Sequence, residues 1–159
     1  MTTDEARTSD VAGDASGSWV LSLRPTGLAP AGAAAPGPRV EAALRVLGAG
    51  PVDWGLALAG AMTAAMLASV PELAVPDVEL VLHRGSVAVV LCSLLELHTS
   101  GGLQDLEVPE VLLGPSELVS RGIGIEHMLR SIHTAHAVGI RAMMDECARL
   151  VPPELRFDE

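Results

Sequence analysis

The five histidines are the side chains of this chain that exchange protons near neutral pH. They are His83, His98, His127, His133 and His136. His133 and His136 are three residues apart, a spacing that makes them neighbours on a helix surface. Such a pair can share a small ligand, or it can supply part of a metal or haem site. The pair predicts a ligand-binding site, with a histidine-ligated haem or metal sensor as the alternative.

The rest of a metal site is not visible in the sequence, so we predict no metal ligands and no cofactor. A purely structural role for the pair also stays open. In that interpretation His136 lies on an apolar helix face and bonds a neighbour through one ring nitrogen, while His133 lies beside it at a helix interface.

Catalytic motifs are missing from the sequence. Lys and Tyr do not occur, which excludes lysine-based phosphate binding and Schiff-base chemistry. There is no Gly-x-Ser-x-Gly motif and no Cys-x-x-Cys motif. A small helical enzyme with a histidine base and Glu96 or Glu126 as its partner is the least favoured hypothesis. We therefore predict a protein that is not an enzyme and has no catalytic residues.

Five methionines within the chain offer another kind of site, because the flexible thioether side chain adapts to irregular apolar ligands. Filling the core is the commoner use of such residues, and lining an adaptable apolar pocket is the alternative. The five are Met62, Met66, Met128, Met143 and Met144.

The charge balance constrains the partners and the location. The chain has 20 acidic residues and 10 basic ones, all arginine, for a formal net charge of −10. It should repel DNA, so we expect DNA binding only through a further C-terminal domain. Residues 54–71 carry no charge, but Asp53 and Glu72 flank them where a membrane span usually has basic residues. Cys92 and Cys147 are far apart in the sequence and each lies in an apolar helical segment, where a reduced thiol is the usual state. We predict a cytoplasmic protein with no membrane contact.

The composition divides the chain at about residue 37. Residues 1–37 are rich in Pro, Gly, Ala and Ser, which predicts a flexible tail. Its one apolar patch, residues 19–23, is expected to pair with another chain rather than to dock on the body. Residues 38–159 are expected to form one helical sensory and dimerisation domain.

Proline and glycine separate the helical segments of this domain. Asp53 and Asp77 are the expected N-caps of the second and third helices. Two short helical pieces are expected in residues 103–121, and no segment alternates with the two-residue period of a strand. The fold class is therefore all-α, with helices predicted in residues 39–47, 53–69, 78–98 and 125–150.

The last helix has the clearest periodicity. About 26 residues give it a length of roughly 39 Å, more than a domain of this size covers completely. We therefore expect a partner helix, and a homodimer formed through this element. Its apolar series steps by three or four residues through Ile125, Leu129, Ile132, His136, Ile140, Met143, Cys147 and Leu150.

The start of this helix resembles a bacterial regulator family. Residues 120–136 read Ser-Arg-Gly-Ile-Gly-Ile-Glu-His-Met-Leu-Arg-Ser-Ile-His-Thr-Ala-His. They are similar to the helical N-terminal region of PucR/CdaR-type transcriptional regulators, which is related to the N-terminal domain of RsbR-type stressosome proteins. The positions that match this family are Arg121, Gly122, Glu126, Leu129, Arg130 and His136.

The resemblance extends over about residues 52–150 and implies a globin-like, haem-free helical bundle with a sensory or dimerising role. Such domains precede a DNA-binding helix-turn-helix, or a phosphorylatable domain in the stressosome relatives. The chain departs from the family pattern at Ile132, where tyrosine is usual, and at His133, where arginine is usual. With the matching Arg130, the histidine pair gives the predicted ligand-binding set His133, His136 and Arg130.

Overall fold

A computed structural model describes residues 19–28, 37–99, 118–119 and 122–153. These residues contain no strand, which confirms the all-α prediction. The two helical pieces expected in residues 103–121 lie outside the described residues except for Leu118 and Val119. The elements are the helices α2 (Pro38–Leu47), α3 (Ala49–Ser69), α4 (Pro76–Thr99) and α6 (Ile125–Leu150), with the short 3-10 helices η1 (Trp19–Ser22) and η2 (Pro71–Leu73).

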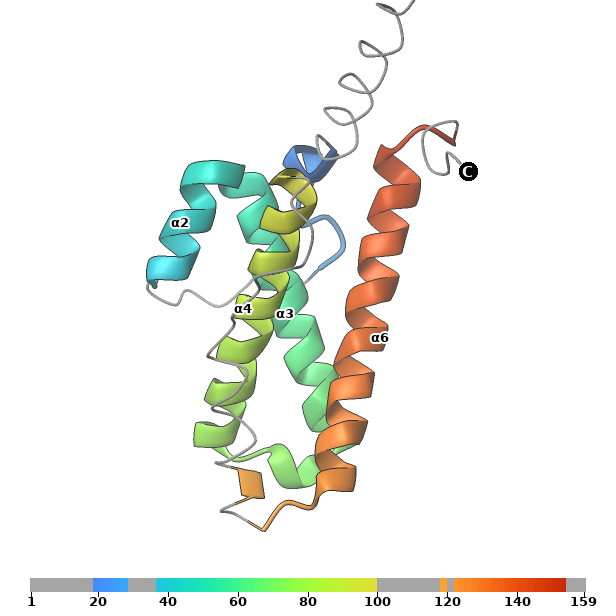
Figure 1. Cartoon of the computed structure of the whole chain (residues 1–159). Coiled ribbons are helices and arrows are strands. Elements are labelled where there is room, and N and C mark those ends of the chain that lie inside the picture. Colours follow the sequence, from blue (N-terminus) through green and yellow to red (C-terminus); the bar gives the residue numbers. More distant parts are fainter. Residues whose placement is uncertain (1–18, 29–36, 100–117, 120–121, 154–159) are drawn as a thin grey trace, which may run out of the picture.

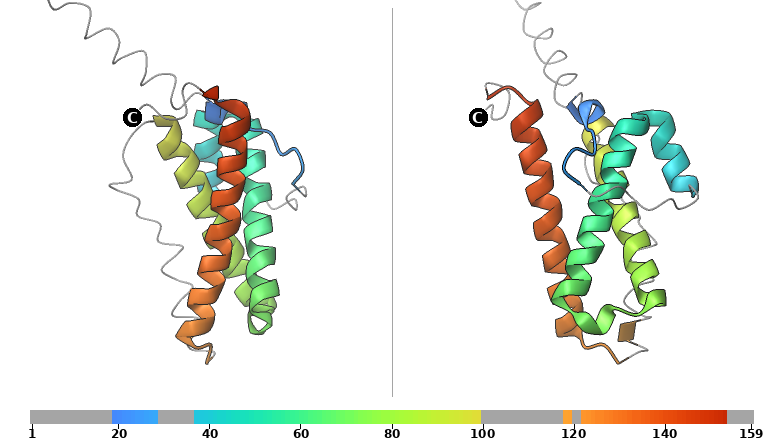
Figure 2. Two further views of the ribbon diagram at one scale, coloured as in Figure 1. Left: turned by 90° about the vertical axis from the view of Figure 1, so that its right-hand side faces the viewer. Right: turned by 180° about the vertical axis from the view of Figure 1, so that it is seen from behind.

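Helix α3 lies at the centre of the arrangement (Figures 1 and 2). It runs antiparallel to α4 and to α6, so those two helices point in the same direction. Helix α3 packs extensively on both of them, whereas α4 and α6 make few direct contacts with each other. The two outer helices are therefore held mainly through α3.

The helix boundaries agree with the proline and glycine pattern, but neither predicted N-cap is at a helix end. Asp77 lies in the first turn of α4, which begins at Pro76, so it is not the N-cap of that helix. Gly48 separates α2 from α3, and its φ of 78° lies in the left-handed region that favours glycine. Helix α3 begins directly after it, earlier than predicted, so Asp53 lies inside the helix and is not its N-cap. The β-branched run Val87–Val90 lies inside α4, which confirms the prediction of a helix there.

Helices α3 and α4 enclose the core. Trp54 and Leu58 of α3 are buried against Leu91 and Leu94 of α4 in one cluster. Gly55 permits this close approach, because a Cβ atom at this position would lie 3.2 Å from the side chains of both leucines. Since both helices are apolar on most of their surface, each can pack on more than one neighbour.

The apolar patch near the N-terminus belongs to the body. Val20 and Leu23 are fully buried and are part of the main core cluster. The Arg24 guanidinium donates a hydrogen bond of 3.0 Å to the Leu21 carbonyl, which secures the turn after η1. The expectation that this patch pairs with another chain is wrong for these residues, because burial against α3 and α4 already removes their side chains from water.

Helices α3 and α4 are each long and apolar enough to cross a membrane, judged on length and composition alone. Core helices of soluble proteins pass the same test, and both helices contribute buried residues to the bundle.

Candidate functional site

Helix α6 has three distinct faces. The face toward α3 is built from small residues, among which Ser131 and Ala135 are buried. A second face is exposed and charged, and it carries Arg130, Arg141 and Asp145. A third face, named here the exposed apolar stripe, consists of large apolar side chains that remain in solvent: Ile125, Leu129, Ile132, Ile140 and Met144.

The exposed apolar stripe contains half of the apolar series that the sequence shows, namely Ile125, Leu129, Ile132 and Ile140. Ile125 is 71% exposed and Ile140 is 65% exposed, although both lie on the face that periodicity would place against a core. The packed face is rotated from this stripe by roughly a third of a helical turn. Small side chains let α6 approach α3 closely, and the large apolar residues are left without a partner in the described part of the chain.

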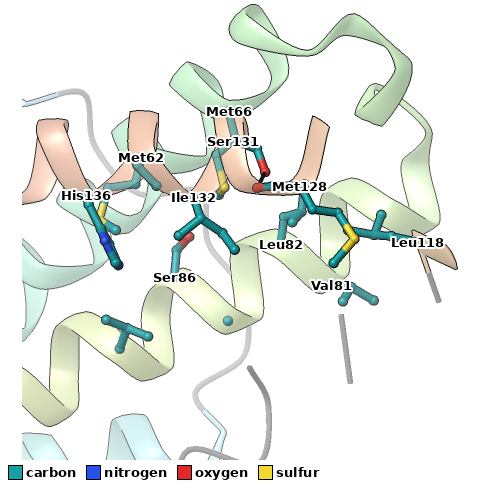
Figure 3. Close-up of a pocket in the computed structure, with 13 residues that line it drawn as sticks. Met62, Met66, Val81, Leu82, Ser86, Leu118, Met128, Ser131, Ile132 and His136 are labelled. Atoms are coloured by element: carbon teal, nitrogen blue, oxygen red, sulfur yellow. Dashed lines mark hydrogen bonds between the residues drawn. The ribbon is translucent and has the colours of Figure 1, made fainter. Parts of the chain in front are cut away.

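Two adjacent cavities lie between α4 and α6, with residues of α3 between them. The first has a volume of about 290 Å³ and extends from Leu118 and Met128 to His136 (Figure 3). The second has a volume of about 390 Å³ and continues along α6 as far as Met144. Because both cavities are lined by Met62, Val89 and His136, we describe them together as the α4–α6 groove.

Methionine is concentrated in this groove. The chain has six methionines, and all of them except Met1 line one of the two cavities. Met62 and Met66 come from α3 and the others from α6. Met62 and Met66 are buried in the main core cluster and the partly buried Met143 packs against it, which confirms the core-filling role for these three residues. All five also line the cavities, as the alternative of an adaptable apolar pocket requires.

The polar side chains of the groove are few: one histidine and three serines line the two cavities. His136 points from α6 toward α4, where Ser86 lies on the facing helix (Figure 3). The Ser131 hydroxyl donates a hydrogen bond of 2.8 Å to the Met128 carbonyl of its own helix. No Asp, Glu or Arg side chain occurs among the described residues that line either cavity. The groove can therefore offer hydrogen bonds but no fixed charge.

The three predicted ligand-binding residues have different positions. His136 lines both cavities. His133 and Arg130 are exposed on α6 and line neither cavity. The three side chains do not converge on one cavity, because each step of three residues turns by about 60° around the helix, which puts Arg130 about 120° away from His136. Their common binding role remains a prediction.

The other histidines lie apart from this pair. His83 Nδ1 is 3.5 Å from the Thr63 hydroxyl, so it links α4 to α3. His127 lines a separate cavity with Glu72 at the end of the bundle. His98 is near the end of α4, and its buried Nδ1 atom has no hydrogen-bond partner among the described residues. Within the part of the chain that the structure describes, no group of three or more His, Cys, Asp or Glu side chains is arranged to hold a metal ion.

Ser86 is the groove residue that the sequence did not indicate. It is buried, and it follows Gly85 within a long apolar helix. The only feature of the sequence that sets Ser86 apart is that it forms, with Gly85, a pair of small residues just before the β-branched run of α4. Periodicity could not identify it, because α4 is apolar on most sides and no single face is marked as the one toward α6.

Comparisons with known proteins add no relationship: no protein-family model, no curated protein and no solved structure matches the chain.

Proposed function

We propose that this chain is a non-catalytic regulatory domain that senses a signal and dimerises, in a bacterial transcriptional regulator of the PucR/CdaR type. The observation that carries this proposal is the exposed apolar stripe of α6. Contiguous apolar surface of this kind is uncommon on monomeric proteins and marks interaction sites. A second copy of the chain would cover the stripe by placing its own α6 against it, as in a homodimer.

The character of the bundle supports the same proposal. An all-helical domain with a long last helix fits the globin-like architecture expected for this family. The charge of −10 is consistent with a cytoplasmic domain whose regulator contacts DNA through another module. An RsbR-like stressosome sensory protein would use the same surfaces and differs in the module that follows.

A connection between sensing and dimerisation is available in α6 itself. Ile132 and Ile140 belong to the exposed apolar stripe and also line the α4–α6 groove. A molecule bound in the groove would therefore contact the helix that forms the dimer. Differential binding to the monomer and the dimer would shift the equilibrium between them, which is the basis of a regulatory response.

Fusion to a DNA-binding domain tests this function. The full chain is placed before a domain that represses its operator only as a dimer, and repression of a reporter gene is measured. We expect at least tenfold stronger repression than with the DNA-binding domain alone, because the stripe supplies the dimer contact. Repression equal to that of the DNA-binding domain alone would contradict the proposed function.

A further inference from the structure

The α4–α6 groove has the features of a small-molecule site. Natural ligand pockets have volumes of about 300–1,000 Å³ and a mostly apolar lining with a few polar groups. The two cavities of the groove, about 290 and 390 Å³, fall in or near this range. An apolar cavity of about 150 Å³ is already large enough for benzene. Either cavity therefore has room for a ring system with substituents.

The lining determines the charge of a suitable ligand. No Asp, Glu or Arg lines the cavities among the described residues, in a chain that has 20 acidic and 10 basic residues. A charged ligand would lose its hydration without gaining an opposite charge, which is costly. A neutral molecule loses much less hydration free energy when it enters the groove. The hydrogen-bonding side chains are those of His136, Ser86, Ser93 and Ser131, and the Ser131 hydroxyl already bonds to its own helix. His136 and Ser86 line the same cavity, so one polar group of a ligand there can bond to either of them.

The methionines indicate the shape of the ligand. Sulfur atoms make favourable contacts with aromatic rings, and the unbranched side chain adjusts to irregular outlines. Met62 borders both cavities, Met66 and Met128 border the first, and Met143 and Met144 border the second. No Trp or Phe side chain is among the described residues that line the groove. Aromatic rings of a ligand would then meet thioethers on several sides.

We propose that the α4–α6 groove binds an uncharged, ring-containing apolar molecule through its methionine lining, with one hydrogen-bonding group of the ligand placed between His136 and Ser86. The proposal names the ligand class of the proposed sensory domain and rests on that function for its biological meaning. Binding itself does not require dimerisation.

Two fluorescent probes with the same ring skeleton test this inference. N-phenyl-1-naphthylamine is neutral and carries one N–H group, and 8-anilino-1-naphthalenesulfonate adds an anionic sulfonate. Fluorescence titration of the full chain should show saturable binding of the neutral probe and at least tenfold weaker binding of the anionic one. Equal affinity for both probes, or no saturable binding of the neutral probe, would overturn the proposal.

Matched histidine variants locate the site. His136→Ala should weaken binding of the neutral probe by about 2–10-fold, the value of one hydrogen bond converted to affinity. His127→Ala is the control, because this histidine of the same helix lines a separate cavity and neither cavity of the groove, and the affinity of this variant for the probe should be unchanged. Equal effects of the two substitutions would contradict placement in the groove.

The titration is repeated with the double variant Ile125→Glu and Leu129→Glu, whose positions lie on the exposed apolar stripe and outside both cavities. Retained binding of the neutral probe in this variant supports the ligand site even if the proposed dimer fails. Binding that occurs only in this variant would contradict the proposal, because a second copy would then cover the groove in the native protein.

Discussion

Replacing Ile125 and Leu129 together by glutamate is expected to convert a dimer of this chain into a folded monomer. Both side chains are large, exposed and absent from the core clusters and the cavities, so their loss should leave the bundle intact. In a dimer formed through the exposed apolar stripe, two unpaired carboxylates per chain would be buried. We expect the dissociation constant to rise by more than about 100-fold, equivalent to roughly 3 kcal/mol.

Sedimentation equilibrium over a range of concentrations measures this change, with circular dichroism as the test of folding. Arg130→Glu is the matched control. It changes the net charge by the same amount as the double variant, and it lies on the same part of α6 but on the charged face. We expect this control to remain dimeric. Loss of the dimer in both variants would point to a general charge effect and contradict a role specific to the stripe.

The second large effect is expected in the core. Trp54→Ala should lower the free energy of unfolding by about 3–5 kcal/mol, the range for truncating a buried aromatic residue. Trp54 is only 1% exposed and lies in the main core cluster. Because small domains are stable by about 5–15 kcal/mol, such a loss would leave little stability. Urea unfolding followed by circular dichroism gives the value.

Trp19→Ala is the matched comparison for this substitution, because Trp19 is the other tryptophan of the chain and is only partly buried in η1. We expect it to cost clearly less than Trp54→Ala. A loss below about 1 kcal/mol for Trp54→Ala would show that the packing of α3 against α4 is not the main source of stability.

The positions of the helices could be predicted because their ends are encoded locally. Pro38, Gly48 and the residues around Pro71 mark helix boundaries through backbone restrictions that act within a few residues. The last helix was predicted over residues 125–150 from its periodicity, and α6 spans the same range. Such signals do not depend on the rest of the fold.

The face that α6 turns toward the core could not be predicted in this way. Periodicity identifies the side with the largest apolar residues, and the packed side instead contains Ser131 and Ala135. Close packing of two helices depends on side-chain size at the contact as well as on hydrophobicity. The partner helix α3 presents Met62, a long side chain whose sulfur would lie 3.5 Å from a Cβ atom at Gly139 of α6. Whether side chains match in size depends on both helices, so the sequence of one helix alone does not show it.

The candidate site, like the fold, could be predicted from the sequence only in part. His136 was predicted from its residue type, and it lines the groove. Arg130 and His133 were predicted with it and line neither cavity, because spacing along a helix does not specify which side faces a neighbour. Ser86 was missed since its position opposite His136 depends on how α3 holds α4 and α6.

Oxidative cross-linking at position 140 tests the central claim that α6 pairs with a second α6. Cysteine is introduced as Ile140→Cys in a Cys147→Ser background, while Cys92 remains because it is buried. Ile140 belongs to the exposed apolar stripe, is 65% exposed and lies near the middle of α6, so the two copies come close whether the helices pair parallel or antiparallel. We predict a disulfide-linked dimer for this variant and none for Arg141→Cys on the charged face. Equal cross-linking at both positions, or none at position 140, would contradict dimerisation through the exposed apolar stripe.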